Sequence, residues 1–152
     1  MKIVDSIKDK VLIPFRLVPA DGLTPEKIAF SITIGILSGI FPVIGLTTIL
    51  SLLLTLLFRQ NLLVVQSVQW VMALFQVLLI IPFIRFGAFL LNHQALHINI
   101  EQIKLAFEPG ILNGLKTIGI LHLYGIFTWS IIAIPLGVIS YLVFLFVFKK
   151  KT

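Results

Sequence analysis

The chain has 152 residues, of which 59% are hydrophobic and only 12% are charged, and its formal net charge is +6. Soluble domains carry about 25% charged residues, so this composition excludes a water-soluble globular protein. The sequence contains no cysteine, which excludes disulfides and sites built from thiolates. Basic residues lie at the ends of apolar runs instead of forming a nucleic-acid-binding patch, so we expect membrane lipids and no nucleic acid as partners. These features predict a single all-α integral membrane domain over residues 1–152.

Residues 1–23 are expected to form an interfacial segment ahead of the first apolar run. Ile3, Ile7 and Val11 recur at intervals of four, and charged residues occupy the opposite side of this pattern. The spacing indicates an amphipathic helix that lies on the membrane surface. A helix that binds a partner protein is the alternative interpretation of the same pattern.

An apolar run in residues 24–58 is interrupted near its middle by three residues that disfavour a continuous membrane helix, namely Gly39, Pro42 and Gly45. As one helix, Ile28–Phe58 would be about 46 Å long, which exceeds a ~30 Å hydrocarbon core unless the helix tilts or bends. If Phe41–Gly45 is a true break, the run forms two half-helices that enter and leave the membrane by the same face. We favour this re-entrant helical hairpin over a through-span.

The distribution of basic residues supports the hairpin. With a hairpin, nine of the twelve Lys and Arg residues lie on the cytoplasmic side, whereas a through-span leaves eight there. The three lysines at 149–151 abut the last apolar run, and such a cluster is a strong marker of the cytoplasmic side. We therefore expect both termini in the cytoplasm.

The two arms of the hairpin each carry a stripe of small residues at a spacing of four. Ser31, Gly35 and Gly39 form the first stripe, and the second consists of Thr47, Ser51 and Thr55. Small residues at this spacing let two backbones approach closely in lipid, so we expect the arms to pack on each other. Hydroxyls that bond back to carbonyls of their own helix are the alternative.

A second apolar run, in residues 62–92, is long enough to cross the bilayer. Gln66, Gln69 and Gln76 fall on one face of it. Amides are costly in lipid, so this face is expected to point toward protein or water.

Beyond this span, residues 93–118 are expected to form an amphipathic connection on the outer side, with a separate short helical piece at Ile111–Ile118. Residues 119–148 form the last transmembrane helix, and Tyr124 and Trp129 within it suit a membrane interface. The predicted fold therefore combines one re-entrant hairpin, two transmembrane helices and short interfacial helices.

A set of motifs extends from Thr24 to Gly87. A proline precedes the first apolar run, a G-x-x-x-G-x-x-P-x-x-G core follows, then Arg-x-Asn, and later a proline and an arginine ahead of a glycine: Pro25, Gly35, Gly39, Pro42, Gly45, Arg59, Asn61, Pro82, Arg85 and Gly87. This pattern resembles the bacterial membrane family called domain of unknown function 2062. Relatives often carry an asparagine and a proline in the second apolar run, where this chain has Gln69 and Leu74.

The resemblance implies a protein of the bacterial inner membrane but supplies no function. Some relatives appear fused to glycosyltransferase domains, which implies a link to envelope glycan or lipid metabolism. No carboxylate lies within an apolar run, and the sequence has no phosphate-binding or nucleophile motif. We therefore predict no catalytic residue, no metal site and no cofactor.

Broken membrane helices present free backbone groups and positive helix ends, which transporters use to bind substrates. The main hypothesis is that the chain transports or flips an anionic, lipid-linked envelope metabolite, and that it dimerises to do so. The candidate substrate-binding residues are Gly39, Pro42, Gly45, Thr47, Thr48, Arg59, Arg85, Gln66 and Gln69. Contact of the arginines with lipid phosphates and interhelical bonding by the glutamines are the simpler readings. The alternative function is a non-catalytic anchor or organising subunit for an envelope lipid or glycan enzyme.

Overall fold

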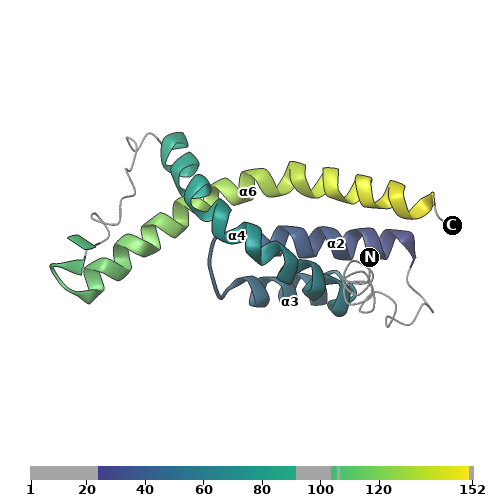
Figure 1. Cartoon of the computed structure of the whole chain (residues 1–152), viewed down its shortest axis with the longest axis horizontal. Coiled ribbons are helices and arrows are strands. Elements are labelled where there is room, and N and C mark those ends of the chain that lie inside the picture. The colour runs from purple at the N-terminus through teal and green to yellow at the C-terminus, as the bar shows by residue number, and fades with distance from the viewer. Residues whose placement is uncertain (1–23, 92–103, 106, 151–152) are drawn as a thin grey trace, which may run out of the picture.

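The computed structural model describes residues 24–91, 104–105 and 107–150. All labelled elements in this part of the chain are helices, which confirms the all-α class (Figure 1). The expected interfacial segment, residues 93–103 and 106 of the outer connection, and Lys151 lie outside the described residues. In chain order the helices are α2 (Pro25–Gly39), α3 (Thr47–Leu57), α4 (Leu62–Leu90) and α6 (Ile111–Lys149).

The break in the first apolar run is present, and we call residues 40–46 the turn. Helix α2 stops at Gly39, because Pro42 has no N–H and disfavours helical backbone in the residue before it. Gly45 has φ +89°, in the left-handed region where side chains are strained. Helix α3 therefore starts only at Thr47, two residues later than the sequence pattern suggested.

Helix α3 runs back alongside α2 after the turn (Figure 1). Ser31, early in α2, donates a hydrogen bond to Oε1 of Gln60 at 3.4 Å and accepts one from the backbone N–H of Asn61 at 3.2 Å. Both partners follow the end of α3, so the chain returns to the end of the molecule from which α2 started.

Helices α4 and α6 are the two long apolar helices, and each is long and apolar enough to cross a membrane. At ~1.5 Å per residue they are about 43 and 58 Å long. Large apolar side chains are exposed along both, for example Leu78 and Ile134. The separate helical piece expected at Ile111–Ile118 is wrong, because α6 continues through Gly119 without interruption. A single glycine lowers the stability of a helix by only about 1 kcal/mol, which is too little to interrupt a helix as long as α6.

Helices α4 and α6 cross where Gly87 meets Tyr124 (Figure 1). A Cβ added at Gly87 would collide with the backbone carbonyl of Tyr124. Next to this contact, the buried Thr128 donates a hydrogen bond to the carbonyl of Phe83 at 2.8 Å. The crossing therefore depends on direct backbone approach, for which a glycine is needed.

Helix α2 packs against both α4 and α6. Its glycine stripe faces α4: a Cβ at Gly35 would lie 2.7 Å from Cβ of Val68, and one at Gly39 would collide with Met72. The expectation that these glycines face the second arm is therefore wrong. The apolar side chains of α4 fill the groove that the glycines leave, while α3 meets α2 along another face.

The second small-residue stripe bonds mainly within its own helix. Thr47, Ser51 and Thr55 are all buried, as expected. Thr55 donates to the carbonyl of Ser51 at 2.6 Å, and Ser51 donates to the carbonyl of Thr48 at 2.9 Å. The alternative of back-bonding hydroxyls is thus confirmed for these two residues, because such bonds satisfy a hydroxyl without needing a partner helix.

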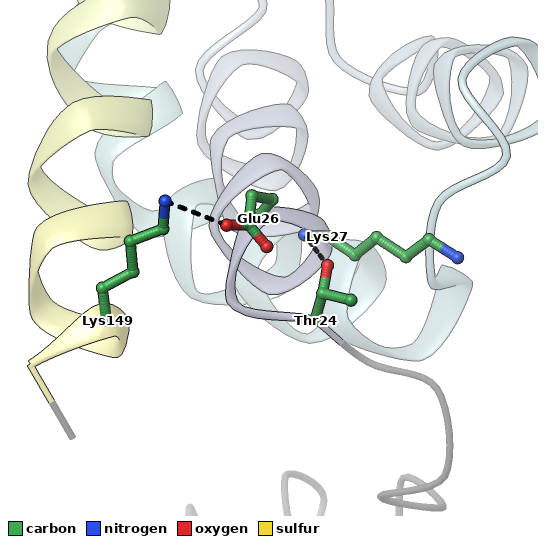
Figure 2. A network of polar contacts seen from close by, with 4 residues as sticks. All are labelled: Thr24, Glu26, Lys27 and Lys149. Carbon is green, nitrogen blue, oxygen red and sulfur yellow. Dashed lines mark hydrogen bonds and ion pairs between the residues drawn. The ribbon is translucent and has the colours of Figure 1, made fainter. Parts of the chain in front are cut away.

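The start of α2 and the end of α6 lie together (Figure 2). Lys149 forms an ion pair with Glu26 at 3.1 Å, and Thr24 caps α2 by accepting from the backbone N–H of Lys27 at 3.4 Å. The pKa of the Glu26 carboxyl is lowered, mainly by a hydrogen bond with the backbone of Glu26 itself. Hydrogen bonds with Lys149 and Thr24 lower this pKa further. Because the pKa of Glu26 is lower in the folded chain than in the unfolded chain, its ionised form stabilises the fold. This stabilisation is fully present above the unfolded pKa and is lost as pH falls through the folded pKa.

Candidate functional site

Seven of the nine candidate residues lie around the turn and the first half of α3, and two do not. Nε2 of Gln69 donates to Oγ1 of Thr48 at 3.2 Å, and Nε2 of Gln66 donates to Oγ of Ser51 at 2.8 Å. Arg59 follows the far end of α3. Arg85 lies 16 residues beyond Gln69 in α4, or about 24 Å along the helix. Arg59 therefore lies away from the turn, whereas Arg85 is exposed and directly follows Ile84, which packs with Pro42 of the turn beside Gly125.

The glutamine face of α4 points into the protein, as the sequence predicted. Gln69 and Gln76 are only 4% and 5% exposed. Gln66 and Gln69 bond to side chains of α3, and Nε2 of Gln76 donates to the carbonyl of Phe41 in the turn at 2.8 Å. Interhelical hydrogen bonding, the simpler reading of these amides, is confirmed.

Two side chains outside the candidate list brace the turn from the protein side. Gln76 bonds to Phe41, and Nε1 of Trp129 donates to the carbonyl of Leu37 at 3.0 Å. The ring of Trp129 also meets the ring of Phe41 edge-on at 5.0 Å. Trp129 is part-buried against α2, and the expectation that it suits a membrane interface stays a prediction. An indole N–H within an apolar run needs an acceptor, and this was the available signal.

Gly39 and Pro42 serve packing, not ligand contact. Pro42 is fully buried, and its Cβ would lie 3.1 Å from a Cβ at Gly125 of α6. The space beside Gly39 is filled by Met72 and Gln69. No room for a ligand remains at either residue, so these two members of the candidate set hold the turn in place.

The opposite side of the turn is open. Nothing lies within 4 Å of a Cβ placed at Gly45, and Gly45, Leu46 and Thr48 are exposed. Leu46 gives α3 no side-chain cap. The first intrahelical bond at this end is from the N–H of Leu50 to Leu46. The N–H groups of residues 47–49 therefore have no acceptor within α3.

Gln69 brings an unused polar atom to this end of α3. Its Oε1 is buried and has no hydrogen-bond partner among the described residues. Because Nε2 of the same carboxamide bonds to Thr48, Oε1 lies beside the first turn of α3. Exchanging the two amide atoms would still leave one of them unpaired. An unpaired buried polar atom costs about 1–3 kcal/mol. Oε1 is an acceptor, so this atom itself would pair with a donor and not with an anion.

The arrangement is rich in donors and suits an anion. The hydroxyl oxygen of Thr48 accepts from Gln69, which leaves its own proton free to donate. Together with the free N–H groups, this donor lies at the positive end of the α3 dipole. No group of His, Cys, Asp or Glu in the described part of the chain could hold a metal ion. The chemistry visible at this point is binding.

Comparison with known proteins supports a family but no activity. No curated protein and no solved structure matches the chain. The model of a family described as an uncharacterized protein conserved in bacteria, DUF2062, matches residues 15–152. This match covers most of the chain, including every helix described above. The chain therefore belongs to the DUF2062 family of uncharacterized bacterial proteins.

Proposed function

We propose that this chain is a multi-pass protein of the bacterial inner membrane in which α2 and α3 form a re-entrant hairpin. The depth of the turn supports this placement. Gln76, which bonds to the turn, lies 14 residues from either end of α4, or about 21 Å. Trp129 is similarly near the middle of α6. The turn therefore sits at mid-depth if α4 and α6 span the bilayer.

The basic residues at the other end of the bundle support cytoplasmic termini. Lys27 at the start of α2, Arg59 after α3, and Lys149 and Lys150 at the end of α6 all belong to the end where the chain returns. Basic residues flanking apolar helices favour the cytoplasmic side. On this placement the turn opens into the membrane from the cytoplasmic half.

On this framework, the chain binds an anionic, lipid-linked envelope metabolite at the start of α3 and moves it between leaflets. The observation that carries this proposal is the Thr48 hydroxyl, which Gln69 holds beside the uncapped start of α3. Lipid hydrocarbon cannot form hydrogen bonds with free backbone N–H groups. On the proposed placement, a polar ligand, water or another protein must therefore cover the start of α3. A phosphate-bearing headgroup supplies acceptors for those N–H groups and for the Thr48 hydroxyl.

An organising subunit for an envelope enzyme is the second candidate. The packing of Gly39 and Pro42 favours it, because the turn is filled on its protein side and shows no passage there. A partner protein, or a second copy of this chain, would then cover the start of α3 instead of a headgroup.

Single cysteines test the hairpin directly, since the chain has none of its own. We expect Lys27→Cys and Gln60→Cys to react with a membrane-impermeant maleimide from the cytoplasmic side, and Lys116→Cys from the opposite side. Labelling is measured in spheroplasts and in inverted vesicles. Labelling of Lys27→Cys and Gln60→Cys from opposite faces would exclude a re-entrant hairpin.

Substituting Thr48 tests the binding site. We expect Thr48→Val to slow movement of a fluorescent phosphatidylglycerol across liposomes by about tenfold, because a hydrogen bond to a charged group is worth about 1.5–3 kcal/mol. Quenching of outer-leaflet fluorescence with dithionite measures the rate.

Thr117→Val is the matched control, because among the described residues the Thr117 hydroxyl bonds only to the carbonyl of Asn113 within α6. We expect it to keep the native rate. A native rate in a correctly inserted Thr48→Val protein would remove the start of α3 from the mechanism. Liposomes that show no flux with the unmodified chain alone would favour the organising subunit.

A further inference from the structure

A hollow lies at the end of the bundle where α2 starts and α6 ends, far along α3 from the turn. Its volume is about 300 Å³. The lining residues come from α2, from the connection between α3 and α4, and from α6: Glu26, Lys27, Phe30, Gln60 and Tyr141. Three segments distant in the sequence therefore form one recess at this end.

The floor of the hollow is aromatic and held in place. Phe30 meets Phe58 edge-on at 5.3 Å between ring centroids and meets Tyr141 in the same way at 5.9 Å. Gln60 is fixed as well, since its Nε2 donates to the carbonyl of Phe58 and its Oε1 accepts from Ser31. These contacts give the recess an apolar base that exists without a ligand.

The rim carries two donors with no partner among the described residues. Lys27 extends away from the Glu26–Lys149 pair (Figure 2), and no ion pair within the described part of the chain uses its ammonium group. The hydroxyl of Tyr141 likewise has no hydrogen bond to a described residue. Glu26, by contrast, is already paired with Lys149. The net effect is a free ammonium and a free hydroxyl above an aromatic floor.

We propose that this hollow binds the phosphodiester of a membrane glycerophospholipid. The Lys27 ammonium forms an ion pair with the phosphate, and the Tyr141 hydroxyl donates to one of its oxygens. Phe30 contacts the glycerol and the first methylenes of the acyl chains. A free phosphate ion would reach the same donors but would gain nothing from the aromatic floor, which is why a lipid is the better fit.

The charges around the hollow fit the same ligand. Lys149 at the end of α6 pairs with Glu26 of the lining, Lys150 follows it in the sequence, and Arg59 directly precedes Gln60. Basic residues at this level attract the phosphates of anionic lipids. This inference needs the chain to lie in a membrane, but it does not need the chain to transport anything, because the hollow and the start of α3 use different residues.

Native mass spectrometry of the detergent-purified chain tests the proposal with dioleoyl phosphatidylglycerol as the probe. We expect Lys27→Gln to weaken lipid binding about fivefold, since a basic residue near a lipid surface contributes about 1 kcal/mol. Tyr141→Phe keeps the ring contact with Phe30 and should weaken binding by a smaller factor. Lys116→Gln removes the same charge at the start of α6, away from the hollow, and should bind like the unmodified chain.

Each outcome bears on the proposal. Equal losses in Lys27→Gln and Lys116→Gln would overturn the site, because they would show attraction by net charge alone. Displacement of the lipid by millimolar inorganic phosphate would overturn the lipid as the ligand. Similar binding of phosphatidylethanolamine and phosphatidylglycerol supports recognition of the shared phosphodiester. Thr48→Val should leave this binding unchanged, so a failed transport proposal and a failed headgroup site give different results.

Discussion

Gly87→Ala is expected to destabilise the chain by about 3 kcal/mol, the upper end of the cost of overpacking. The added methyl group would collide with the backbone carbonyl of Tyr124, and it would also lie 2.8 Å from Oγ1 of Thr128. A backbone carbonyl in a helix cannot move aside as a flexible side chain can. Helices α4 and α6 must therefore separate at their crossing, which also lengthens the hydrogen bond from Thr128 to Phe83. Unfolding by SDS in mixed micelles measures the loss.

Gly119→Ala is the matched control for this substitution. It lies in α6, and nothing is within 4 Å of the position its Cβ would take. Alanine favours a helix over glycine by about 1 kcal/mol, so this variant should be as stable as the unmodified chain or more stable. Equal stability of Gly87→Ala and Gly119→Ala would contradict the close crossing of α4 and α6.

Trp129→Phe is expected to cost about 1–3 kcal/mol by leaving the carbonyl of Leu37 without a donor. The backbone N–H of Phe41 would reach Leu37 in a continued helix, but it bonds to Ser38 at 3.3 Å instead. Trp129 supplies the missing donor from α6. Phenylalanine retains an aromatic ring against Phe41, so the loss reports on the indole N–H. The same SDS titration measures it.

Trp70→Phe separates this effect from the general cost of replacing a tryptophan. Trp70 in α4 is 70% exposed and takes part in no hydrogen bond or ring contact with a described residue. Its replacement should change stability by less than about 0.5 kcal/mol. Equal effects of the two substitutions would show that the bond to Leu37 contributes nothing.

The interruption of the first apolar run could be predicted from sequence because it is encoded locally. Pro42 removes a backbone donor, and Gly45 permits a left-handed conformation, so neither depends on distant contacts. The boundaries shifted by two residues, since Gly39 ends α2 and Thr47 starts α3. Local propensity places a break in the chain, but it does not fix which flanking residues join each helix.

The sequence predicted only in part which neighbouring helix packs against each helix face. The cost of amides in lipid was enough to turn the Gln69 and Gln76 side chains inward. The stripe that includes Gly35 was assigned to the wrong neighbour, because periodicity defines a face but not the helix that covers it. The hydrogen bond of Trp129 was not predicted for a related reason: its acceptor is the carbonyl of Leu37, 92 residues earlier in the chain.

The candidate site was likewise predicted in part. Thr48 and Gln69 were both in the candidate set, and the structure joins them by a hydrogen bond. Arg59 and Arg85 were added for their charge, which carries no information about distance through the fold. Gly39 and Pro42 were chosen correctly as special backbone positions, yet they contact neighbouring helices and leave no space for a ligand.

The bond from Trp129 to Leu37 has a consequence for biosynthesis. The acceptor leaves the ribosome 92 residues before its donor, which takes roughly 5–18 s at ~5–20 residues per second. During this interval the carbonyl at the end of α2 has no indole to meet it. On the proposed membrane placement, we expect α2 and α3 to stay in the insertion machinery or at the wet surface of the bilayer until the last helix is made. Chains truncated before Trp129 should accordingly be substrates for membrane quality-control proteases.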